Sequence, residues 1–203
     1  MKQKLPLTGM ILAGGKSSRM GRDKALLKFG EKTFLEHLAK LLGSIFEETF
    51  ILIDHKEKLG ELELGETKIY EDLQRNSGPL GGIYTGLCYA KTQASCVLTC
   101  DMPFVDEMIL RELVNFWEEE QDVLCLENPQ GRLEPFPGIY ARSSRHLMRL
   151  LLERGEGAVN HFLECAVVKP LVLKEEKIRV LTNMNYIEDY YRVLKEKEEW
   201  ARE

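Results

Sequence analysis

The sequence predicts an α/β fold of three layers, in which helices cover both faces of a mostly parallel sheet. Apolar runs of strand length alternate with segments of helical periodicity along almost all of the 203 residues, a pattern typical of such a sheet. A glycine-rich basic loop follows the first apolar run, and an aspartate follows the most convincing buried strand. Loops that leave the carboxyl ends of parallel strands converge at one edge, so we expect the functional site there.

The first half of the chain supplies strands and helices in alternation. Apolar runs predict four strands, at residues 5–12, 49–54, 68–72 and 95–100. Five apolar residues at helical spacing predict a helix after the first strand, namely Phe34, Leu35, Leu38, Leu41 and Leu42. Residues 76–82 predict a turn that opens a second helix, with Pro79 in the first turn, where its missing N–H loses no bond. Leu80, Ile83 and Leu87 give that helix an apolar face.

The second half of the chain continues the alternation with shorter elements. Helical spacing predicts four helices, at residues 106–119, 143–152, 158–164 and 186–200. Apolar runs predict strands at residues 122–126, 138–141 and 178–181, and a late strand within 167–173 that Pro170 breaks. The last helix carries Ile187, Tyr190, Tyr191 and Leu194 on one face, so we expect it to dock on the core.

Composition limits the partners and the compartment. The formal net charge is −5, so we expect no general attraction to nucleic acid or to an anionic membrane. The length suits a single domain over residues 1–203, and no stretch approaches the roughly 18 apolar residues of a membrane span. An odd number of cysteines without C-x-x-C spacing predicts buried, reduced thiols and a cytoplasmic location; they are Cys88, Cys96, Cys100, Cys125 and Cys165.

The loop after the first strand concentrates glycine and positive charge. The adjacent Gly14 and Gly15 let backbone N–H groups approach anionic oxygens. Four cations follow within nine residues: Lys16, Arg19, Arg22 and Lys24. A triphosphate needs such a cluster because negative charge develops on its leaving group. A Walker A loop would require glycine where Met10 stands, and no G-x-G-x-x-G is present here, so a P-loop kinase and a Rossmann dehydrogenase both lose their main support.

An aspartate at a strand end is the candidate metal ligand. Asp101 follows the strand at residues 95–100 and precedes Met102-Pro103. Magnesium prefers one or two carboxylates together with water and substrate phosphate oxygens. An aspartate in this position is more often a turn or helix-cap residue, but its combination with the basic loop favours a metal role.

Five motifs together resemble the molybdenum cofactor guanylyltransferase family, which has the Rossmann-like sheet of the nucleoside-diphosphate-sugar transferases. Residues 12–24 are similar to its L-A-G-G-x-S-x-R-M-G-x-D-K loop, Asp72 with residues 78–83 to its D…G-P-L-x-G-I element, and residues 100–104 to its C-D-x-P-F/Y metal motif. Residues 131–140 are similar to an acceptor-side element, and 183–185 to its N-x-N. The resemblance runs from about residue 7 to about residue 190.

The resemblance implies a reaction and a set of site residues. GMP would pass from GTP to the terminal phosphate of Mo-molybdopterin with Mg²⁺ as cofactor, and the protein partners would be other molybdenum cofactor proteins or apo-molybdoenzymes. Arg19, Lys24 and Asp101 would be catalytic, with Asp101 also the metal ligand. The implied nucleotide contacts are Leu12, Ala13, Gly14, Gly15, Lys24, Asp72, Gly82 and Asp101. The implied acceptor-side residues are Arg132, Pro135, Asn183 and Asn185.

Two departures from the family pattern leave alternatives open. The turn after the second strand is Ile53-Asp54-His55-Lys56 in place of N-A-N-R, and Asn185 is followed by Tyr186-Ile187 in place of T-P. A related transferase could use CTP with the same pterin, or another triphosphate with a sugar phosphate. A third alternative, from a different class, is a non-catalytic protein that delivers the cofactor.

Overall fold

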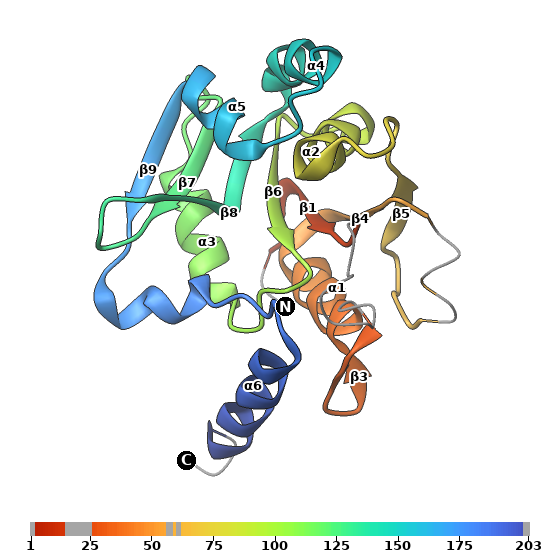
Figure 1. Cartoon of the computed structure of the whole chain (residues 1–203), viewed down its shortest axis with the longest axis vertical. Coiled ribbons are helices and arrows are strands. Elements are labelled where there is room, and N and C mark those ends of the chain that lie inside the picture. The colour runs from red at the N-terminus through yellow and green to blue at the C-terminus, as the bar shows by residue number, and fades with distance from the viewer. Residues whose placement is uncertain (1–2, 15–25, 56–58, 60–61, 201–203) are drawn as a thin grey trace.

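The computed structural model describes residues 3–14, 26–55, 59 and 62–200. Seven strands form one sheet in the order β5-β4-β1-β6-β8-β7-β9 (Figure 1). Their bounds are β1 Leu5–Leu12, β4 Phe46–Ile53, β5 Lys68–Glu71, β6 Ala94–Thr99, β7 Val123–Glu127, β8 Leu133–Ala141 and β9 Val168–Val172. Only β8 runs antiparallel to its neighbours, β6 and β7, and the other pairings are parallel. The mostly parallel α/β fold is therefore confirmed.

Helices cover both faces of the sheet. The helices are α1 Phe34–Ile45, α2 Gly78–Tyr89, α3 Glu107–Phe116, α4 Arg145–Glu153, α5 Val159–Cys165 and α6 Ile187–Trp200. One apolar core holds residues of α1, α3 and α6, and the other holds residues of α2, α4 and α5. Strand β1 feeds both cores, because Ile11 faces the first while Met10 and Leu12 face the second. Successive side chains of a strand point to opposite faces, which explains why nearly the whole run is apolar.

Helix α1 begins with a capping box that its sequence encodes. The Thr33 hydroxyl accepts from the Glu36 N–H at 3.3 Å, and the Glu36 carboxylate accepts from the Thr33 N–H at 2.7 Å. The Thr33 hydroxyl also donates to the Glu36 carboxylate at 2.6 Å, and this bond, followed by the one from the Thr33 N–H, lowers the pKa of Glu36 to about 2. A short hairpin, β2 Lys28–Phe29 with β3 Lys32–Thr33, leads into this cap. The sequence pattern did not predict the hairpin, because each strand is only two residues long.

Two predictions for the second half of the chain were wrong. Residues 178–181 were expected to form a strand, but they lie in a 3₁₀ helix, Glu175–Leu181. Arg179 of this helix lies over the Phe104 ring, 3.8 Å from its centroid. Val180 is buried in the first apolar core and Leu181 packs against it, so these apolar residues cover the core without joining the sheet. Pro170 does not break β9, because β9 is an edge strand, where a missing backbone donor is tolerated.

The cysteines follow the prediction only in part. All five lie in the described part of the chain, and none forms a disulfide. Cys96 and Cys125 are buried, and burial raises the pKa of each thiol to about 12. Cys165 at the end of α5 is exposed, so the expectation that all five are buried was wrong. Among the described residues, no helix has both the length and the apolar character that crossing a membrane requires.

Candidate active site

The carboxyl ends of β1, β4, β5 and β6 meet around one cavity. Backbone hydrogen bonds hold these ends together beyond the strands, from Ala13 N to Leu52 O at 2.8 Å, from Cys100 N to Leu12 O at 3.1 Å, and from the Asp72 N–H to Ile53 O at 2.9 Å. The cavity has a volume of about 570 Å³, within the range of small-molecule sites. Its described lining comprises Leu12, Ala13, Gly14, Leu52, Asp54, Asp72, Asn76, Ser77, Gly78, Pro79, Gly82, Thr99, Cys100 and Asp101. The predicted convergence of the strand-end loops is therefore confirmed.

Asp101 is held in a fixed orientation just beyond the carboxyl end of β6. The Thr99 hydroxyl donates to Asp101 Oδ1 at 2.6 Å, a short hydrogen bond of the charge-assisted kind. The backbone carbonyl of Asp101 accepts from the Met184 N–H at 2.8 Å. The strand end and the C-terminal segment thus both position this residue. The carboxylate is half-buried and lines the cavity.

Asp72, which directly follows β5, provides a buried hydrogen-bond acceptor. Its Oδ1 is buried and has no hydrogen-bond partner among the described residues. Burial, and then the nearby Asp54 carboxylate, raise the pKa of Asp72 to about 6. A buried polar atom without a partner is destabilising by about 1–3 kcal/mol. The position is therefore suited to a ligand that brings a hydrogen-bond donor.

Two glycines let the backbone form the cavity floor. A Cβ on Gly14 would lie 3.2 Å from the backbone nitrogen of Asp54. A Cβ on Gly82 would lie 3.1 Å from Leu12 Cδ2 and 3.6 Å from Asp72 Oδ1. A side chain at either position would displace a neighbour or occupy space beside Asp72. Gly82 belongs to α2, and Gly78 and Pro79 of the same helix also line the cavity, so the N-terminal part of α2 forms one wall.

The turn before α2 has an unusual backbone. Asn76 adopts φ 59° and Gly78 adopts φ 63°, a left-handed conformation that is uncommon for a residue other than glycine. The Ser77 hydroxyl donates to Gln74 O at 2.8 Å. Sequence reasoning recognised this segment as a turn but did not place Asn76, Ser77, Gly78 or Pro79 in the site. The Asn-Ser-Gly-Pro run, with two residues that tolerate positive φ, was the available signal.

Four further residues of the lining were not predicted as site residues. Leu52 lies in β4, Asp54 directly follows β4, Thr99 ends β6 and Cys100 follows it. Asp54 stands in the segment where the sequence departs from the family pattern, so the motif did not single it out. The position of Thr99, two residues before Asp101 on the same strand end, was the signal for its role.

The predicted acceptor-side residues lie in two other places. Asn183 and Asn185 are exposed on either side of Met184, whose N–H binds the Asp101 carbonyl, so this pair lies next to the cavity. Arg132 lies in the turn between β7 and β8 and has a side chain that is 72% exposed. Pro135 is in β8, and its carbonyl accepts from the Tyr140 hydroxyl at 2.8 Å. None of these four residues is among the described residues that line the cavity.

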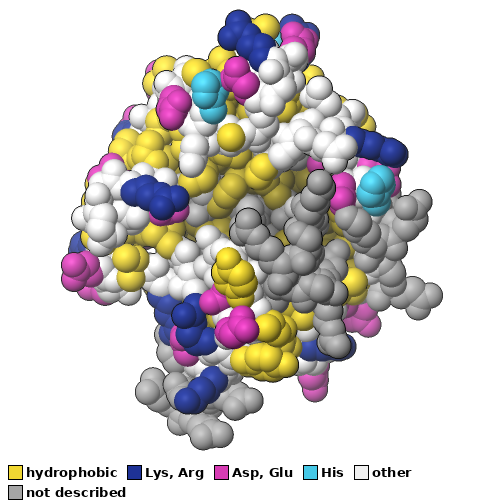
Figure 2. Space-filling view, in the orientation of Figure 1, with side chains coloured by type: hydrophobic (Ala, Val, Ile, Leu, Met, Phe, Trp, Pro, Cys, Tyr) yellow, Lys and Arg dark blue, Asp and Glu magenta, His cyan; other side chains and the backbone are white. Residues whose placement is uncertain are grey.

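Three predicted site residues, Gly15, Arg19 and Lys24, lie outside the described residues. Leu12, Ala13, Gly14, Asp72, Gly82 and Asp101 are the predicted residues that the structure brings together. Figure 2 shows the face seen in Figure 1, where hydrophobic side chains gather in the middle of the molecule and charged side chains lie mainly towards its edge.

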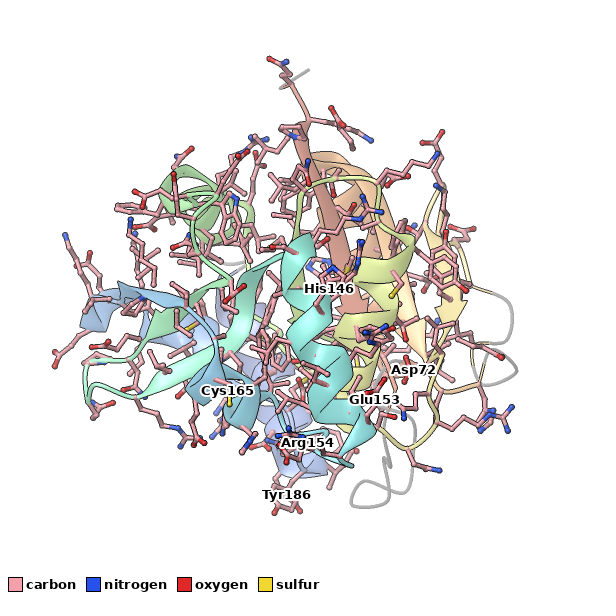
Figure 3. All side chains as sticks on the ribbon, turned by 90° about the horizontal axis from the view of Figure 1, so that it is seen from above. Asp72, His146, Glu153, Arg154, Cys165 and Tyr186 are labelled. Atoms are coloured by element: carbon pink, nitrogen blue, oxygen red, sulfur yellow. The ribbon has the colours of Figure 1, made fainter. Side chains whose placement is uncertain are left out.

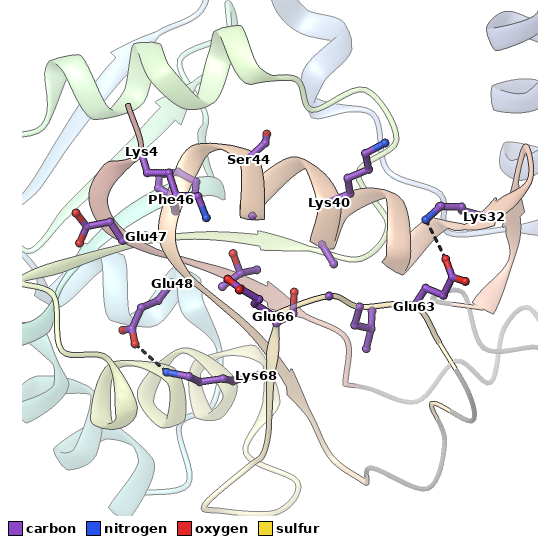
Figure 4. Close-up of a pocket in the computed structure, with 16 residues that line it drawn as sticks. Lys4, Lys32, Lys40, Ser44, Phe46, Glu47, Glu48, Glu63, Glu66 and Lys68 are labelled. Atoms are coloured by element: carbon purple, nitrogen blue, oxygen red, sulfur yellow. Dashed lines mark hydrogen bonds and ion pairs between the residues drawn. The ribbon is translucent and has the colours of Figure 1, made fainter. Parts of the chain in front are cut away.

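A larger cavity lies elsewhere and has a different character. It has a volume of about 840 Å³ and runs along α1, β4 and the segment that leads to β5 (Figure 4). Lys4, at the amino end of β1, lines it, so it is remote from the carboxyl ends of the strands. Its lysines and glutamates are equal in number and include the ion pairs Lys32–Glu63 and Lys68–Glu48. Such a balance offers no net attraction for a triphosphate.

A family model described as the MobA-like NTP transferase domain matches residues 9–168. The chain is 34% identical over 196 residues to a protein of Clostridium perfringens (strain 13) named probable molybdenum cofactor guanylyltransferase, a comparison that covers 93% of this chain and 96% of the other. It is 31% identical over 179 residues to a protein of the same name from Flavobacterium johnsoniae, which covers 88% and 92% of the two chains.

The chain belongs to the MobA-like NTP transferase family. It is a nucleotidyltransferase, and it matches most of the length of these two relatives, which are named as guanylyltransferases. The solved structure of molybdopterin-guanine dinucleotide biosynthesis protein A from Archaeoglobus fulgidus has the same fold, with a TM-score of 0.82 at 21% identity, over 95% of this chain and all of the other. The fold is also that of 2-C-methyl-D-erythritol 4-phosphate cytidylyltransferase from Thermus thermophilus, with a TM-score of 0.68 at 14% identity, over 93% and 97% of the chains.

Proposed function

We propose that this transferase moves GMP from GTP to the terminal phosphate of Mo-molybdopterin, which yields the guanine dinucleotide cofactor and pyrophosphate. The observation that carries the proposal is the single cavity in which Gly14, Asp72, Gly82 and Asp101 come together at the ends of neighbouring strands. The names of the relatives support the guanylyl group and the pterin acceptor. We assign the base and the phosphates to the two ends of this cavity and the acceptor to the Asn183–Asn185 segment beside it.

The guanine base is assigned to the Asp72 end of the cavity. Guanine presents the N1–H and N2–H donors side by side, and an ionised carboxylate accepts two hydrogen bonds. Asp72 has a buried oxygen that no described residue uses. A Cβ on Gly82 would lie 3.6 Å from that oxygen, so the glycine keeps the position beside it free of a side chain. Binding of guanine would therefore satisfy the buried acceptor.

The phosphates are assigned to the other end, between Gly14 and Asp101. Gly14 begins the glycine-rich loop, whose backbone N–H groups and cations suit a triphosphate. Arg19 and Lys24 are proposed to stabilise the negative charge that develops on the departing pyrophosphate. Their positions lie outside the described residues, so this role rests on the motif alone.

The residues at the end of β6 fit a hard divalent cation. Asp101 offers a carboxylate whose orientation Thr99 fixes, and Mg²⁺ commonly uses one or two carboxylates with water and substrate phosphate oxygens. Among the described residues, no group of three or more His, Cys, Asp or Glu side chains is arranged to hold a metal ion. When bound, Mg²⁺ would neutralise charge on the phosphates.

The transfer itself needs little proton chemistry. An oxygen of the pterin's terminal phosphate attacks the α-phosphorus of GTP, a new P–O bond forms, and the bond to the bridging oxygen of pyrophosphate breaks. A phosphate monoester is largely ionised near neutral pH, so no general base is required. Catalysis then depends on alignment of the two phosphates and on charge stabilisation. The Asn183–Asn185 segment, joined to Asp101 through Met184, is proposed to position the acceptor.

A label-transfer assay tests the proposal. The wild-type chain is incubated with Mg²⁺, Mo-molybdopterin and α-³²P-labelled GTP, beside parallel reactions with CTP, ATP and UTP. Label that reaches the pterin only from GTP is the expected result. Absence of transfer from GTP, with transfer from another triphosphate, would contradict the guanylyl assignment.

A second candidate is a cytidylyltransferase that uses the same acceptor. The observation in its favour is Asp54, which stands where the sequence departs from the family's N-A-N-R turn and lines the cavity beside Asp72. Cytosine offers a single amino group as donor on its pairing edge, so it would use the buried Asp72 acceptor less completely than guanine. The same assay separates the two candidates, because transfer from CTP would be the dominant reaction in one of them only.

A further inference from the structure

The connector between α4 and α5 touches the wall of the cavity through one glycine. The carbonyl of Gly157 accepts from the Leu80 N–H of α2 at 3.3 Å. A Cβ built on Gly157 would lie 2.7 Å from the carbonyl carbon of Ser77 and would overlap the Ser77 oxygen. A Cβ on Gly78 would lie 2.7 Å from Gly157 O. The two backbones are therefore in contact with no room for a methyl group on either side.

The connector side of this contact is firmly anchored. The N–H groups of Arg154, Gly155 and Glu156 all bind carbonyls in the last turn of α4. Val159 and Phe162 of α5 are buried directly after the connector. Figure 3 shows Glu153 and Arg154 at the same end of the molecule as Asp72. An added methyl group on Gly157 would therefore push mainly against the turn before α2.

The turn side of the contact belongs to the cavity. Ser77 and Gly78 line it together with Asn76, whose φ of 59° is a conformation that the surrounding structure must maintain. The described lining does not include residues 154–158. Since Gly82, one turn further along α2, faces Asp72, the turn borders the end of the cavity assigned to the base.

We infer that Gly157 is a positioning residue for nucleotide binding, because its lack of a side chain fixes the position of the cavity wall formed by Asn76–Gly78. The inference rests on the proposed nucleotide site. The wall is remote from the bond that breaks, so its displacement weakens the binding of substrate and transition state alike. KM for the nucleotide then rises while kcat at saturation changes little. A residue with a merely structural role would lower the active fraction, and hence kcat, at an unchanged KM.

The test compares Gly157→Ala with Gly155→Ala. Gly155 lies in the same connector and has φ 80°, but a Cβ there would meet nothing within 4 Å. Gly155→Ala therefore introduces local backbone strain without touching the turn. Titrations with GTP, CTP, ATP and UTP in the presence of Mg²⁺ measure Kd, thermal melting measures folding, and the label-transfer assay measures KM and kcat.

For Gly157→Ala we expect Kd and KM for the preferred triphosphate to rise at least about tenfold, with kcat within about twofold of wild type. Gly155→Ala should melt at a lower temperature and keep the wild-type Kd. A Gly157→Ala protein that folds and binds with unchanged Kd would overturn the inference. If wild type prefers a triphosphate other than GTP but Gly157→Ala weakens its binding, the guanine assignment fails and the positioning role stands.

Hydrogen exchange on the wild-type chain gives a second readout that needs no variant. If Gly157→Ala does not fold, this readout decides the matter. Binding of the triphosphate should slow exchange in the peptide that covers residues 154–158, although these residues do not line the cavity. Unchanged exchange in that peptide, with protection of residues 76–82, would show that nucleotide binding at the wall does not affect the connector. That result would overturn the inference.

Discussion

The two halves of the sheet build their parts of the site in different ways. In one half, β5, β4, β1 and β6 are parallel, and their carboxyl ends form the cavity from backbone, glycines and three carboxylates. In the other half, β8, β7 and β9 include an antiparallel hairpin, and the residues proposed for the acceptor include the exposed Arg132. The first half depends on the position of the main chain, whereas the second offers side chains that lie outside the described cavity lining.

The largest expected effect comes from the carboxylate at the end of β6. Asp101→Asn should lower kcat by about a thousandfold, because charge stabilisation at the phosphates is lost. The label-transfer assay at saturating GTP measures this effect. Asp106→Asn is the matched control, since Asp106 caps α3 through a 2.9 Å bond from Ile109 N and asparagine caps equally well. Near-wild-type turnover in Asp101→Asn would remove the carboxylate from the chemistry.

The next effect concerns the buried acceptor. Asp72→Asn should weaken GTP binding by about tenfold to a hundredfold, because hydrogen bonds to a charged group are lost. The same change should stabilise the unliganded chain. The pKa of Asp72 is raised to about 6, so the ionised carboxylate destabilises the folded state above that pH. Titration with GTP and urea unfolding at pH 8 measure the two effects.

The sign of the stability effect can be checked against pH. As the pH falls from about 6 towards 3.8, the ordinary pKa of an aspartate side chain, the folded state takes up the proton first and wild type gains stability. The advantage of Asp72→Asn should therefore be about 1–2 kcal/mol at pH 8 and vanish below about pH 4. Glu71→Gln, at the exposed end of β5, is the control. An advantage that grows as pH falls would contradict the assignment.

A change at Asp54 should move the pH dependence of binding without removing it. GTP binding should weaken as the pH falls through about 6, because protonated Asp72 loses an acceptor. Burial is the larger cause of the raised pKa and Asp54 the smaller one, so Asp54→Asn should lower the pKa of Asp72 only in part. Titrations between pH 5 and 8 should show that GTP affinity falls at a lower pH in Asp54→Asn than in wild type. If the affinity falls at the same pH in both proteins, the two carboxylates do not interact.

A smaller effect is expected from the hydroxyl that orients Asp101. Thr99→Val removes the 2.6 Å hydrogen bond but keeps the shape of the side chain. Turnover should fall about tenfold and should require more Mg²⁺ for half-maximal rate. Thr92→Val is the control, because the Thr92 hydroxyl donates to Ala94 O at 2.9 Å at the opposite end of β6. An unchanged Mg²⁺ requirement in Thr99→Val would argue against a role in holding the metal ligand.

The smallest effect is expected on the acceptor side. Arg132→Ala should raise KM for the pterin about three- to tenfold and leave GTP affinity and stability unchanged, since the side chain is 72% exposed and lies 3.7 Å from Glu134. Arg149→Ala provides a matched exposed arginine on α4, 3.7 Å from Glu153. If both variants behave alike, the β7–β8 turn does not contact the acceptor.

The contrast between the halves also explains how much the sequence revealed. Parallel strands with apolar residues on both faces have a strong pattern, so β1, β4, β5, β6 and the convergence of their ends were predicted correctly. The strand at residues 178–181 was mispredicted because apolar residues that cover a core end in a 3₁₀ helix look like a buried strand. The link between Met184 and Asp101 spans 83 residues of sequence, and the contact of Gly157 with Ser77 spans 80. No local pattern encodes such contacts.

The most direct test of the central claim is a distance in a structure with bound nucleotide. The wild-type chain would be crystallised with Mg²⁺ and a GTP analogue that carries a methylene group between the α- and β-phosphorus. We expect guanine N1 within about 2.7–3.2 Å of the Asp72 carboxylate, with the phosphates between Gly14 and Asp101. A nucleotide in the cavity along α1, or a base that faces away from Asp72, would contradict it.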